Sequence, residues 1–236
     1  MQKGILYMIP VTLGDENLNN ALPQDVMGIA RKLDYFVVEN EKSARRFLSA
    51  LKTEKPVREL NMQLLNEHTD DKTVPSLLAP LLAGHSMGML SEAGCPGIAD
   101  PGAALADAAH RKGIRVMPLV GPSSILLSLM ASGFNGQQFT FLGYLPSDKN
   151  ARITKLKEIE KRSQKHKETQ IFIETPYRNQ HMLEDILGNL SETTRLCVAS
   201  NVSLPSERII SQPIAGWKKS ELPDLHKQPS VFLILA

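Results

Sequence analysis

Hydrophobic and polar positions alternate in a regular order over the first half of the chain, where short apolar runs are separated by amphipathic stretches. The apolar runs predict strands at Ile5 to Ile9, Tyr35 to Glu39, Ser86 to Ser91 and Arg115 to Leu119. The stretches between them predict helices at Pro23 to Lys32, Ser43 to Leu51, Leu77 to Ala83 and Ala103 to Arg111. Strands joined through helices indicate βαβ crossovers, so this half is predicted to form a mainly parallel sheet.

The pattern changes near Leu119, where a Gly-Pro-Ser-Ser turn opens an apolar helix from Ile125 to Ser132. We therefore predict two α/β domains, residues 1–119 and 120–236. Helices are predicted beyond the turn at Ala151 to about Lys165 and at Asn179 to Leu190. Strands are predicted at Phe139 to Tyr144, Gln170 to Glu174, Arg195 to Ser200, Glu207 to Ser211 and Val231 to Leu235. The last connections are short and favour antiparallel pairing, so the second sheet is predicted to be mixed.

The composition is that of a globular protein, with 42% hydrophobic and 22% charged residues among 236, and it excludes collagen, coiled coil and wholesale disorder. Cys95 and Cys197 are too few for a disulfide framework and are not at zinc-ligand spacing. We therefore expect a reducing, cytoplasmic compartment and no metal site. No apolar run approaches the roughly 20 residues of a membrane-spanning helix, and the first residues are not typical of a signal peptide.

The formal net charge is only +2, but the basic residues are unevenly distributed. Residues 1–120 contain 13 basic and 14 acidic side chains, whereas residues 121–236 contain 14 basic and 11 acidic ones. The densest basic segment contains Lys149, Arg152, Lys155, Lys157, Lys161, Arg162, Lys165 and Lys167, against Glu158 and Glu160. Such a helical face either follows a phosphate backbone or is a solvated face of the kind common in lysine-rich helices. Aromatic residues hardly interleave it, so base stacking is not indicated.

The densest signal for chemistry is the segment Ser91 to Gly102, which follows a predicted strand and precedes a predicted helix. Its glycines permit positive φ angles and close backbone approach to a ligand, and its prolines fix the bends. Ligands of open α/β sheets bind outside the carboxyl ends of strands, so we predict a site here; the alternative is a merely tight turn. The chain has no GxxxxGK followed by Ser or Thr and no GxGxxG after its first strand, which disfavours ATPases and dinucleotide oxidoreductases.

These residues resemble the S-adenosylmethionine-dependent tetrapyrrole methylase superfamily, and within it the branch of small-subunit ribosomal RNA ribose 2′-O-methyltransferases. The segment 91–102 is similar to that branch's S-D-A-G-T-P-x-I-S-D-P-G, with Glu92, Cys95 and Ala99 as departures. Weaker similarities follow in the same order at residues 38–48, 67–68, 120–124, 141–146 and 172–178. The opening A-T-P-I-G-N-L-x-D is reduced at residues 9–15, the T-K-x-x-E-E segment is replaced at 201–207, and Lys42 stands in place of an arginine.

The resemblance implies two α/β/α domains with S-adenosylmethionine in the cleft between them, a homodimer, and ribose 2′-OH methylation of small-subunit ribosomal RNA. The residues that it implies for cofactor binding are Pro10, Ser91, Gly94, Cys95, Pro96, Ser123 and Ser124, with Leu142 and Pro176 from the second domain. Methyl transfer is an in-line displacement that requires no metal and no covalent nucleophile, because the protein chiefly aligns the acceptor and excludes water. We read Cys95 as a small loop residue rather than a reactive thiol.

A ribose hydroxyl is a poor nucleophile and benefits from a nearby general base, for which the candidates are Glu39, Glu67, His68 and Glu174. Arg178 either binds a phosphate or the cofactor's carboxylate, or pairs with a nearby acid. Two other functions fit the sequence. One is methylation of a tetrapyrrole or another small molecule, motivated by the superfamily's fold and the altered segment 201–207. The other is a non-catalytic protein that binds S-adenosylmethionine or RNA, motivated by the reduced opening motif.

Overall fold

The structure of the chain, a computed structural model, describes residues 2–15 and 17–236. It divides into two compact units, Met1–Ser123 and Ser124–Ala236. The division falls four residues after the boundary drawn from the sequence at residue 119. Within the described residues, no helix is both long enough and apolar enough to cross a membrane.

The first unit is built on a five-stranded sheet in the order β3-β2-β4-β1-β5, in which all neighbouring strands are parallel. Its strands are β1 (Ile5–Ile9), β2 (Tyr35–Val38), β3 (Asn61–Leu64), β4 (Met87–Leu90) and β5 (Arg115–Pro118). This confirms the predicted parallel sheet. The sequence did not reveal β3, because this short edge strand is mostly exposed and lacks the buried apolar run that marks the central strands.

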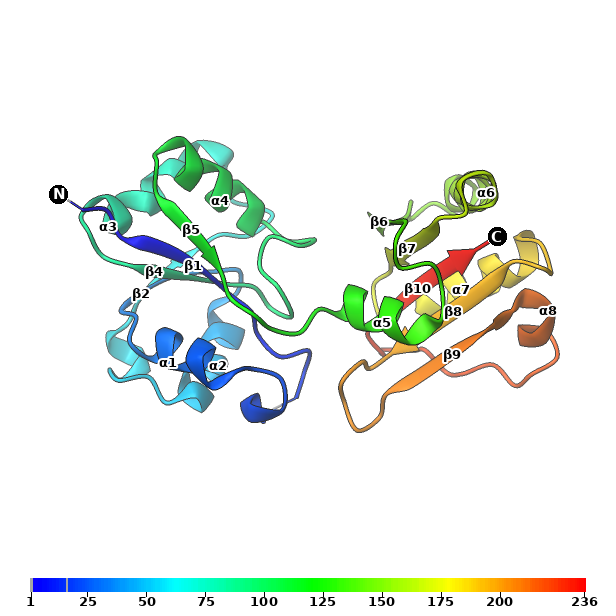
Figure 1. Ribbon diagram of the computed structural model, residues 1–236, viewed down its shortest axis with the longest axis horizontal. Coiled ribbons are helices and arrows are strands. Elements are labelled where there is room, and N and C mark those ends of the chain that lie inside the picture. Colours follow the sequence, from blue (N-terminus) through cyan, green and yellow to red (C-terminus); the bar gives the residue numbers. More distant parts are fainter. Residues whose placement is uncertain (1, 16) are drawn as a thin grey trace. The chain divides into compact units, whose positions relative to one another are not determined.

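Helices cover both faces of this sheet (Figure 1). Along β1, Ile9 packs toward α1 (Gln24–Arg31) and α2 (Glu41–Leu51), whereas Leu6 and Met8 pack toward α4 (Gly102–Arg111). Successive strand residues point to opposite faces, which is why the whole run is apolar. Helix α2 buries Ala44, Phe47, Leu48 and Leu51, the spacing of an amphipathic helix.

The helix predicted at Leu77 to Ala83 is wrong in its extent. A 3₁₀ helix, Asp71–Leu78, contains Pro75, and only the last turn, α3 (Ala79–Leu82), is α-helical. Proline has no N–H to donate, so the α-helical hydrogen-bond ladder is interrupted along this stretch. Shorter 3₁₀ helices lie at Leu18–Asn20 and Val57–Glu59.

The second unit contains a five-stranded sheet in the order β6-β7-β10-β8-β9. Its strands are β6 (Phe139–Tyr144), β7 (Thr169–Ile173), β8 (Arg195–Ser200), β9 (Arg208–Pro213) and β10 (Ser230–Leu235). Strands β6 and β7 are parallel, and the remaining pairs are antiparallel. The sheet is mixed, as predicted, and β8 and β9 pair as the expected hairpin.

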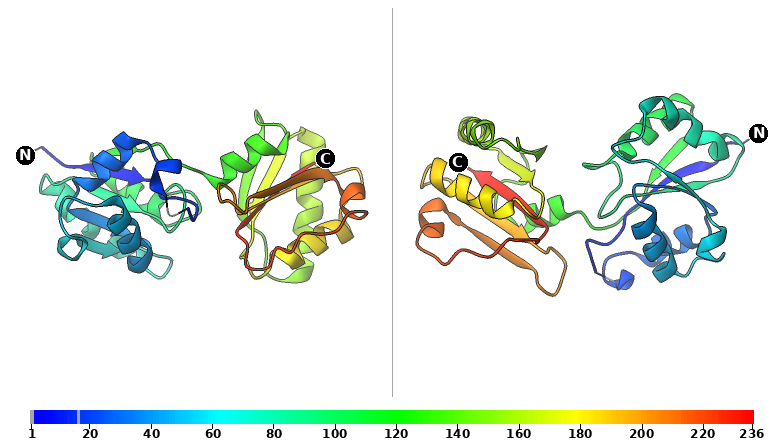
Figure 2. Two further views of the ribbon diagram at one scale, coloured as in Figure 1. Left: turned by 90° about the horizontal axis from the view of Figure 1, so that it is seen from below. Right: turned by 180° about the vertical axis from the view of Figure 1, so that it is seen from behind.

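Helices again cover both faces (Figure 2). The helices α6 (Lys149–His166), α7 (Asn179–Asn189) and α8 (Ile214–Trp217) pack over Phe172 and Phe232, whose rings stack 5.7 Å apart. On the other face, α5 (Ser124–Ser132) packs against Ile171, Cys197 and Leu233. Each unit is therefore a three-layer α/β/α arrangement.

Candidate functional site

The predicted ligand loop connects β4 to α4 and is tied to the segment that follows β1. The backbone N–H of Val11 donates to the carbonyl of Gly94 at 2.9 Å, and the two residues form an isolated antiparallel bridge. Gly94 and Gly97 have φ angles of +74° and +83°, which L side chains rarely adopt. Gly94 and Gly97 are therefore required by the backbone conformation of the loop.

Asp100 holds the second half of the loop in place. Its Oδ1 accepts hydrogen bonds from the backbone N–H of Gly97 at 2.6 Å and of Gly102 at 2.9 Å. Burial raises the pKa of this carboxyl, and the two hydrogen bonds oppose that rise. The loop is thus shaped in part by its own side chain.

Three of the segments predicted to bind the cofactor meet in the first unit. A Cβ atom added to Gly121 would lie 2.3 Å from Cβ of Pro10, so the backbone of Gly121 lies against the ring of Pro10 at a distance that only a glycine allows. The Sγ of Cys95 donates to the carbonyl of Pro122 at 3.3 Å, and burial raises the pKa of this thiol. The structure therefore brings Pro10, the loop with Ser91, Gly94, Cys95 and Pro96, and the turn before Ser123 together.

The other predicted cofactor residues belong to the second unit. Ser124 is the first residue of α5, and Leu142 lies in β6 and packs partly buried against the core beneath α6 and α7. Pro176 lies in the turn after β7, where its carbonyl accepts a hydrogen bond from the N–H of Lys227 at 3.0 Å.

The four candidate bases lie in very different surroundings. Glu39 follows β2, and its Oε2 accepts a hydrogen bond from the N–H of Glu92 at 2.9 Å. Burial raises the pKa of Glu39, and the nearby charges of Asp100, Glu92 and Glu67 raise it further. Glu67 and His68 form an exposed pair, with Oε1 and Nε2 3.6 Å apart and both side chains more than four-fifths exposed.

Glu174, in contrast, is buried and already paired. Its Oε1 accepts hydrogen bonds from Nε and Nη2 of Arg178 at 3.0 and 2.7 Å, and from the N–H of Thr175 at 2.6 Å. Of the two interpretations of Arg178, the structure shows the pair with a nearby acid. Glu174 therefore positions the turn that contains Pro176, and its side chain, only 1% exposed, is not placed as an accessible base.

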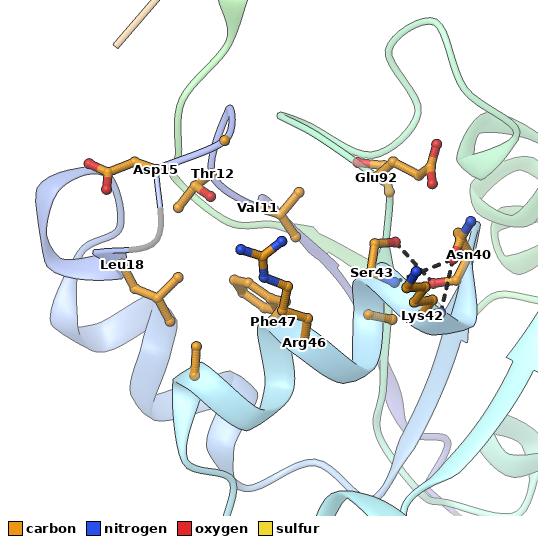
Figure 3. Close-up of a pocket in the computed structure, with 14 residues that line it drawn as sticks. Val11, Thr12, Asp15, Leu18, Asn40, Lys42, Ser43, Arg46, Phe47 and Glu92 are labelled. Atoms are coloured by element: carbon orange, nitrogen blue, oxygen red, sulfur yellow. Dashed lines mark hydrogen bonds between the residues drawn. The ribbon is translucent and has the colours of Figure 1, made fainter. Parts of the chain in front are cut away.

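A pocket of about 560 Å³ opens in the first unit beside the start of the loop (Figure 3). The segment after β1, the first turns of α2 and the residues Ser91 and Glu92 form its walls. Its apolar lining comes from Val11, Leu18, Ala44, Phe47 and Ala50, and its polar lining includes Thr12, Asp15, Asn40, Lys42, Ser43 and Arg46. A mixed lining of this size suits a small organic ligand with both a flat apolar part and charged groups.

The polar residues at the start of helix α2 line this pocket. Asn40 caps the helix, with Oδ1 accepting from the N–H of Lys42 at 2.9 Å and of Ser43 at 3.3 Å. Lys42 and Arg46 are four residues apart and lie on the same side of the helix, and Figure 3 shows Arg46 pointing toward the segment after β1. The pocket therefore combines an apolar floor with a cationic wall.

Thr12, Lys42, Arg46 and Phe47 line the pocket, although the sequence did not predict them as site residues. A signal was present, since residues 9–15 and 38–48 both follow predicted strands and resemble motifs of the methylase branch. Among residues 2–15 and 17–236, no three His, Cys, Asp or Glu side chains are grouped as ligands for a metal ion.

Comparison with known proteins gives relatives that span most of the chain. Ribosomal RNA small subunit methyltransferase I of Vibrio cholerae is 31% identical over 89% of this chain and 69% of that protein. The protein of the same name from Escherichia coli O157:H7 is 30% identical over 93% of this chain and 73% of that protein. No protein-family model matches the chain.

Solved structures share the fold at much lower identity. The methyltransferase CobJ aligns with a TM-score of 0.64 at 16% identity, over 98% of this chain and 94% of that one. Uroporphyrin-III-C-methyltransferase from Thermus thermophilus aligns with a TM-score of 0.56 at 16% identity, over 100% of this chain and 93% of that one. The fold is that of the tetrapyrrole methylases.

Proposed function

Because this chain belongs to the family of the ribosomal RNA small subunit methyltransferase I proteins, we propose that it transfers a methyl group from S-adenosylmethionine to a ribose hydroxyl of small-subunit ribosomal RNA. Membership of this family makes the chain a methyltransferase. The single observation that carries the assignment to this chain's own residues is the loop after β4, which is tied to Val11 and shaped by Asp100.

The loop residues fit such a cofactor. A Cβ atom at Gly94 would make only ordinary contacts, at 3.4 Å from Cδ2 of Leu13 and 3.6 Å from the carbonyl of Pro122, so it is the φ angle of +74° that requires the glycine here. The carboxylates of Glu39 and Asp100 adjoin this loop, and their negative charge favours a cationic ligand over a phosphate. When bound, S-adenosylmethionine supplies an electrophilic methyl group on a sulfonium cation.

We assign the cofactor to the residues that the resemblance implies. In the first unit these are Pro10, Ser91, Gly94, Cys95, Pro96 and Ser123, and in the second Ser124, Leu142 and Pro176. Backbone groups of the loop hold the cofactor. The close contact of Gly121 with Pro10 holds the segment after β1 next to the turn before Ser123.

The pocket beside the loop receives the acceptor nucleotide. Phe47 and Leu18 offer an apolar surface to a base, and Lys42 offers positive charge to its phosphate. Ser91 and Glu92 belong both to the pocket and to the loop, so an acceptor bound there lies beside the cofactor residues of the same unit. Chemically, the chain aligns the hydroxyl and excludes water.

Glu39 is the best placed of the four candidate bases. It is partly buried, its pKa is raised by burial, and one of its carboxylate oxygens remains outside the hydrogen bond to Glu92. A carboxylate with a raised pKa is a better proton acceptor than the same group at its ordinary pKa.

The test is transfer of labelled methyl groups to small ribosomal subunits that lack the native modification. We expect label in the RNA, at a position that resists alkaline cleavage because its 2′-OH is blocked. Gly94→Val, which strains the loop, should abolish labelling, whereas Gly136→Ala, where an added Cβ meets nothing within 4 Å, should leave it unchanged. Cofactor binding without label in RNA would contradict the assignment of the acceptor.

We also propose that the protein is a homodimer in the cytoplasm, as the family resemblance implies. Light scattering of the purified chain distinguishes a mass of 26.1 kDa from twice that value. A monomer at micromolar concentration would contradict the dimer and leave the methyl transfer unaffected.

A further inference from the structure

The outward face of α6 carries a lysine row, which we define as Lys157, Lys161 and Lys165. All three are exposed, and their four-residue spacing places them on one face of the helix. The buried residues of α6 are Arg152, Leu156, Ile159 and Ser163, which define the opposite face. The lysine row is therefore directed away from the core of the second unit.

The structure corrects the basic face predicted for this segment, because about half of its cations are engaged. Arg152 is buried and pairs with Asp185 at 2.6 Å, so it is not part of any surface. Lys155 pairs with Glu158 at 2.8 Å, Arg162 pairs with Glu168 at 2.7 Å, and Lys149 lies 4.0 Å from Asp185.

The lysine row is different from these neighbours. Within the part of the chain that the structure describes, no carboxylate lies within 4.0 Å of any of its three ammonium groups. The nearest acidic residues of α6 are committed elsewhere, since Glu158 pairs with Lys155 and Glu160 accepts from the N–H of Ser191 at 2.8 Å. The positive charge of the row is thus left for a partner.

Folding of the helix does not explain this arrangement. Like charges at i and i+4 destabilise a helix, and the row contains two such pairs. Only Lys165 lies in the last turn, where a cation interacts favourably with the helix dipole. The row therefore costs stability, and it spans about 12 Å at a rise of about 1.5 Å per residue.

We propose that the lysine row binds the phosphate backbone of the RNA substrate; this inference rests on the function proposed above. A phosphodiester chain presents negative charge at regular intervals, and lysine side chains contact it as flexible point charges. Helix α6 contains no Phe, Tyr or Trp, so the row contributes affinity and orientation and does not read bases. It supplies a contact outside the pocket that receives the target nucleotide.

The experiment compares the 236-residue chain with two triple variants of equal net charge. K157Q/K161Q/K165Q removes the row, and K32Q/K72Q/K219Q removes three exposed lysines that lie elsewhere and have no ion pair among the described residues. Glutamine retains the helix propensity of lysine, so the row variant should melt no lower than the wild type. Binding to a labelled fragment of small-subunit ribosomal RNA is measured over a range of salt concentrations.

We expect the row variant to bind RNA about 10-fold more weakly near physiological salt. The slope of log K against log salt should become shallower by about 2, because each contact with a single strand contributes about 0.7. With small subunits as acceptor, KM should rise about 10-fold and kcat should not change. The control variant should keep the wild-type slope, and equal slopes for the two variants would overturn the proposal.

Two further outcomes separate this inference from the proposed function. If the wild type labels no RNA yet binds it through the row, the assigned acceptor fails and the RNA-binding surface stands. The proposed RNA-binding surface is overturned if the wild type binds no RNA at low salt. It is also overturned if the row variant binds RNA like the wild type and loses binding only to vesicles of phosphatidylserine and phosphatidylcholine. Cofactor binding is scored separately by titration with S-adenosylhomocysteine.

Discussion

The carboxylate of Glu39 accepts a hydrogen bond from the backbone N–H of Glu92 at 2.9 Å. The strands β2 and β4 are neighbours in the sheet, and the N–H of Glu39 donates to the carbonyl of Leu90 just before this contact. The side chain thus extends the β2–β4 ladder beyond the end of the strands and fixes the first residues of the loop that we propose to bind the cofactor. Glu39 is therefore a positioning residue as well as a candidate base.

We expect Glu39→Ala to weaken binding of S-adenosylhomocysteine by about 10- to 100-fold, because a hydrogen bond to a charged group contributes about 1.5–3 kcal/mol. Glu39→Gln retains an acceptor for the N–H of Glu92 and should stay within about 3-fold of the wild type. Calorimetric titration measures both, with the exposed Glu67→Ala as the control. Equal losses for the Ala and Gln variants would show that the charge, and not the hydrogen bond, matters.

Gly121→Ala should abolish cofactor binding. The new Cβ would lie 2.3 Å from Cβ of Pro10, a separation that forces one of the two segments to move. Titration with S-adenosylhomocysteine measures the loss, and circular dichroism establishes that the unit still folds. Binding at wild-type affinity would show that the cofactor does not depend on this close approach.

Gly28→Ala is the matched control for that substitution. Gly28 lies inside α1, and an added Cβ meets nothing within 4 Å. Alanine is a better helix former than glycine, so the free energy of unfolding should increase by about 1 kcal/mol. Urea denaturation measures the increase, and cofactor affinity should not change.

Asp185→Asn should destabilise the second unit by about 3–5 kcal/mol, because it leaves a buried guanidinium without its counter-charge. Nε of Arg152 donates to Oδ2 of Asp185 at 2.8 Å, and each side chain is only 7% exposed. The double variant R152M/D185L removes both charges and should be clearly more stable than Asp185→Asn. Urea denaturation compares the three chains; equal stability of the two variants would be inconsistent with a buried ion pair.

Glu168 should make the free energy of unfolding depend on pH in the acid range. Hydrogen bonds from Arg162, Gln170 and Thr140 lower its pKa from 4.5 to about 2. A carboxyl whose pKa is depressed by folding stabilises the protein above the unfolded pKa, and this contribution is lost as the pH falls from 4.5 to about 2. We expect Glu168→Gln to lower the unfolding free energy by about 1 kcal/mol at neutral pH, with a difference that disappears near the lower limit.

Denaturation of the wild type and the Glu168→Gln variant over that pH range measures the difference. A gap between the two chains that stays constant with pH would assign the effect to packing instead of charge. Gln170→Ala, which removes one of the donors to the same carboxylate, should show a smaller dependence of the same sign.

The sequence by itself determined the fold class and most of the elements. Strands such as β1 and β8 are buried on both faces and therefore appear in the sequence as apolar runs. Helices such as α2 bury one face and therefore show apolar residues at helical spacing. Both patterns can be recognised within a short stretch of sequence. The glycines and prolines of the loop after β4 also indicated a ligand site, because the identity of each such residue restricts or permits particular φ angles at its own position.

Only the tertiary structure decided which charges are available. Arg152 and Arg178 are basic residues in surface-like sequences, yet each pairs with a carboxylate that little or no solvent reaches. The lysine row, by contrast, is left without such a partner in the part of the chain described here. The pocket is likewise formed by segments far apart in sequence, because parallel strands bring their carboxyl ends to one edge of the sheet. The local sequence pattern specifies where the chain bends and which face of each element is buried. Ion pairs and cavities depend on residues that are distant in sequence and become neighbours only when the chain folds.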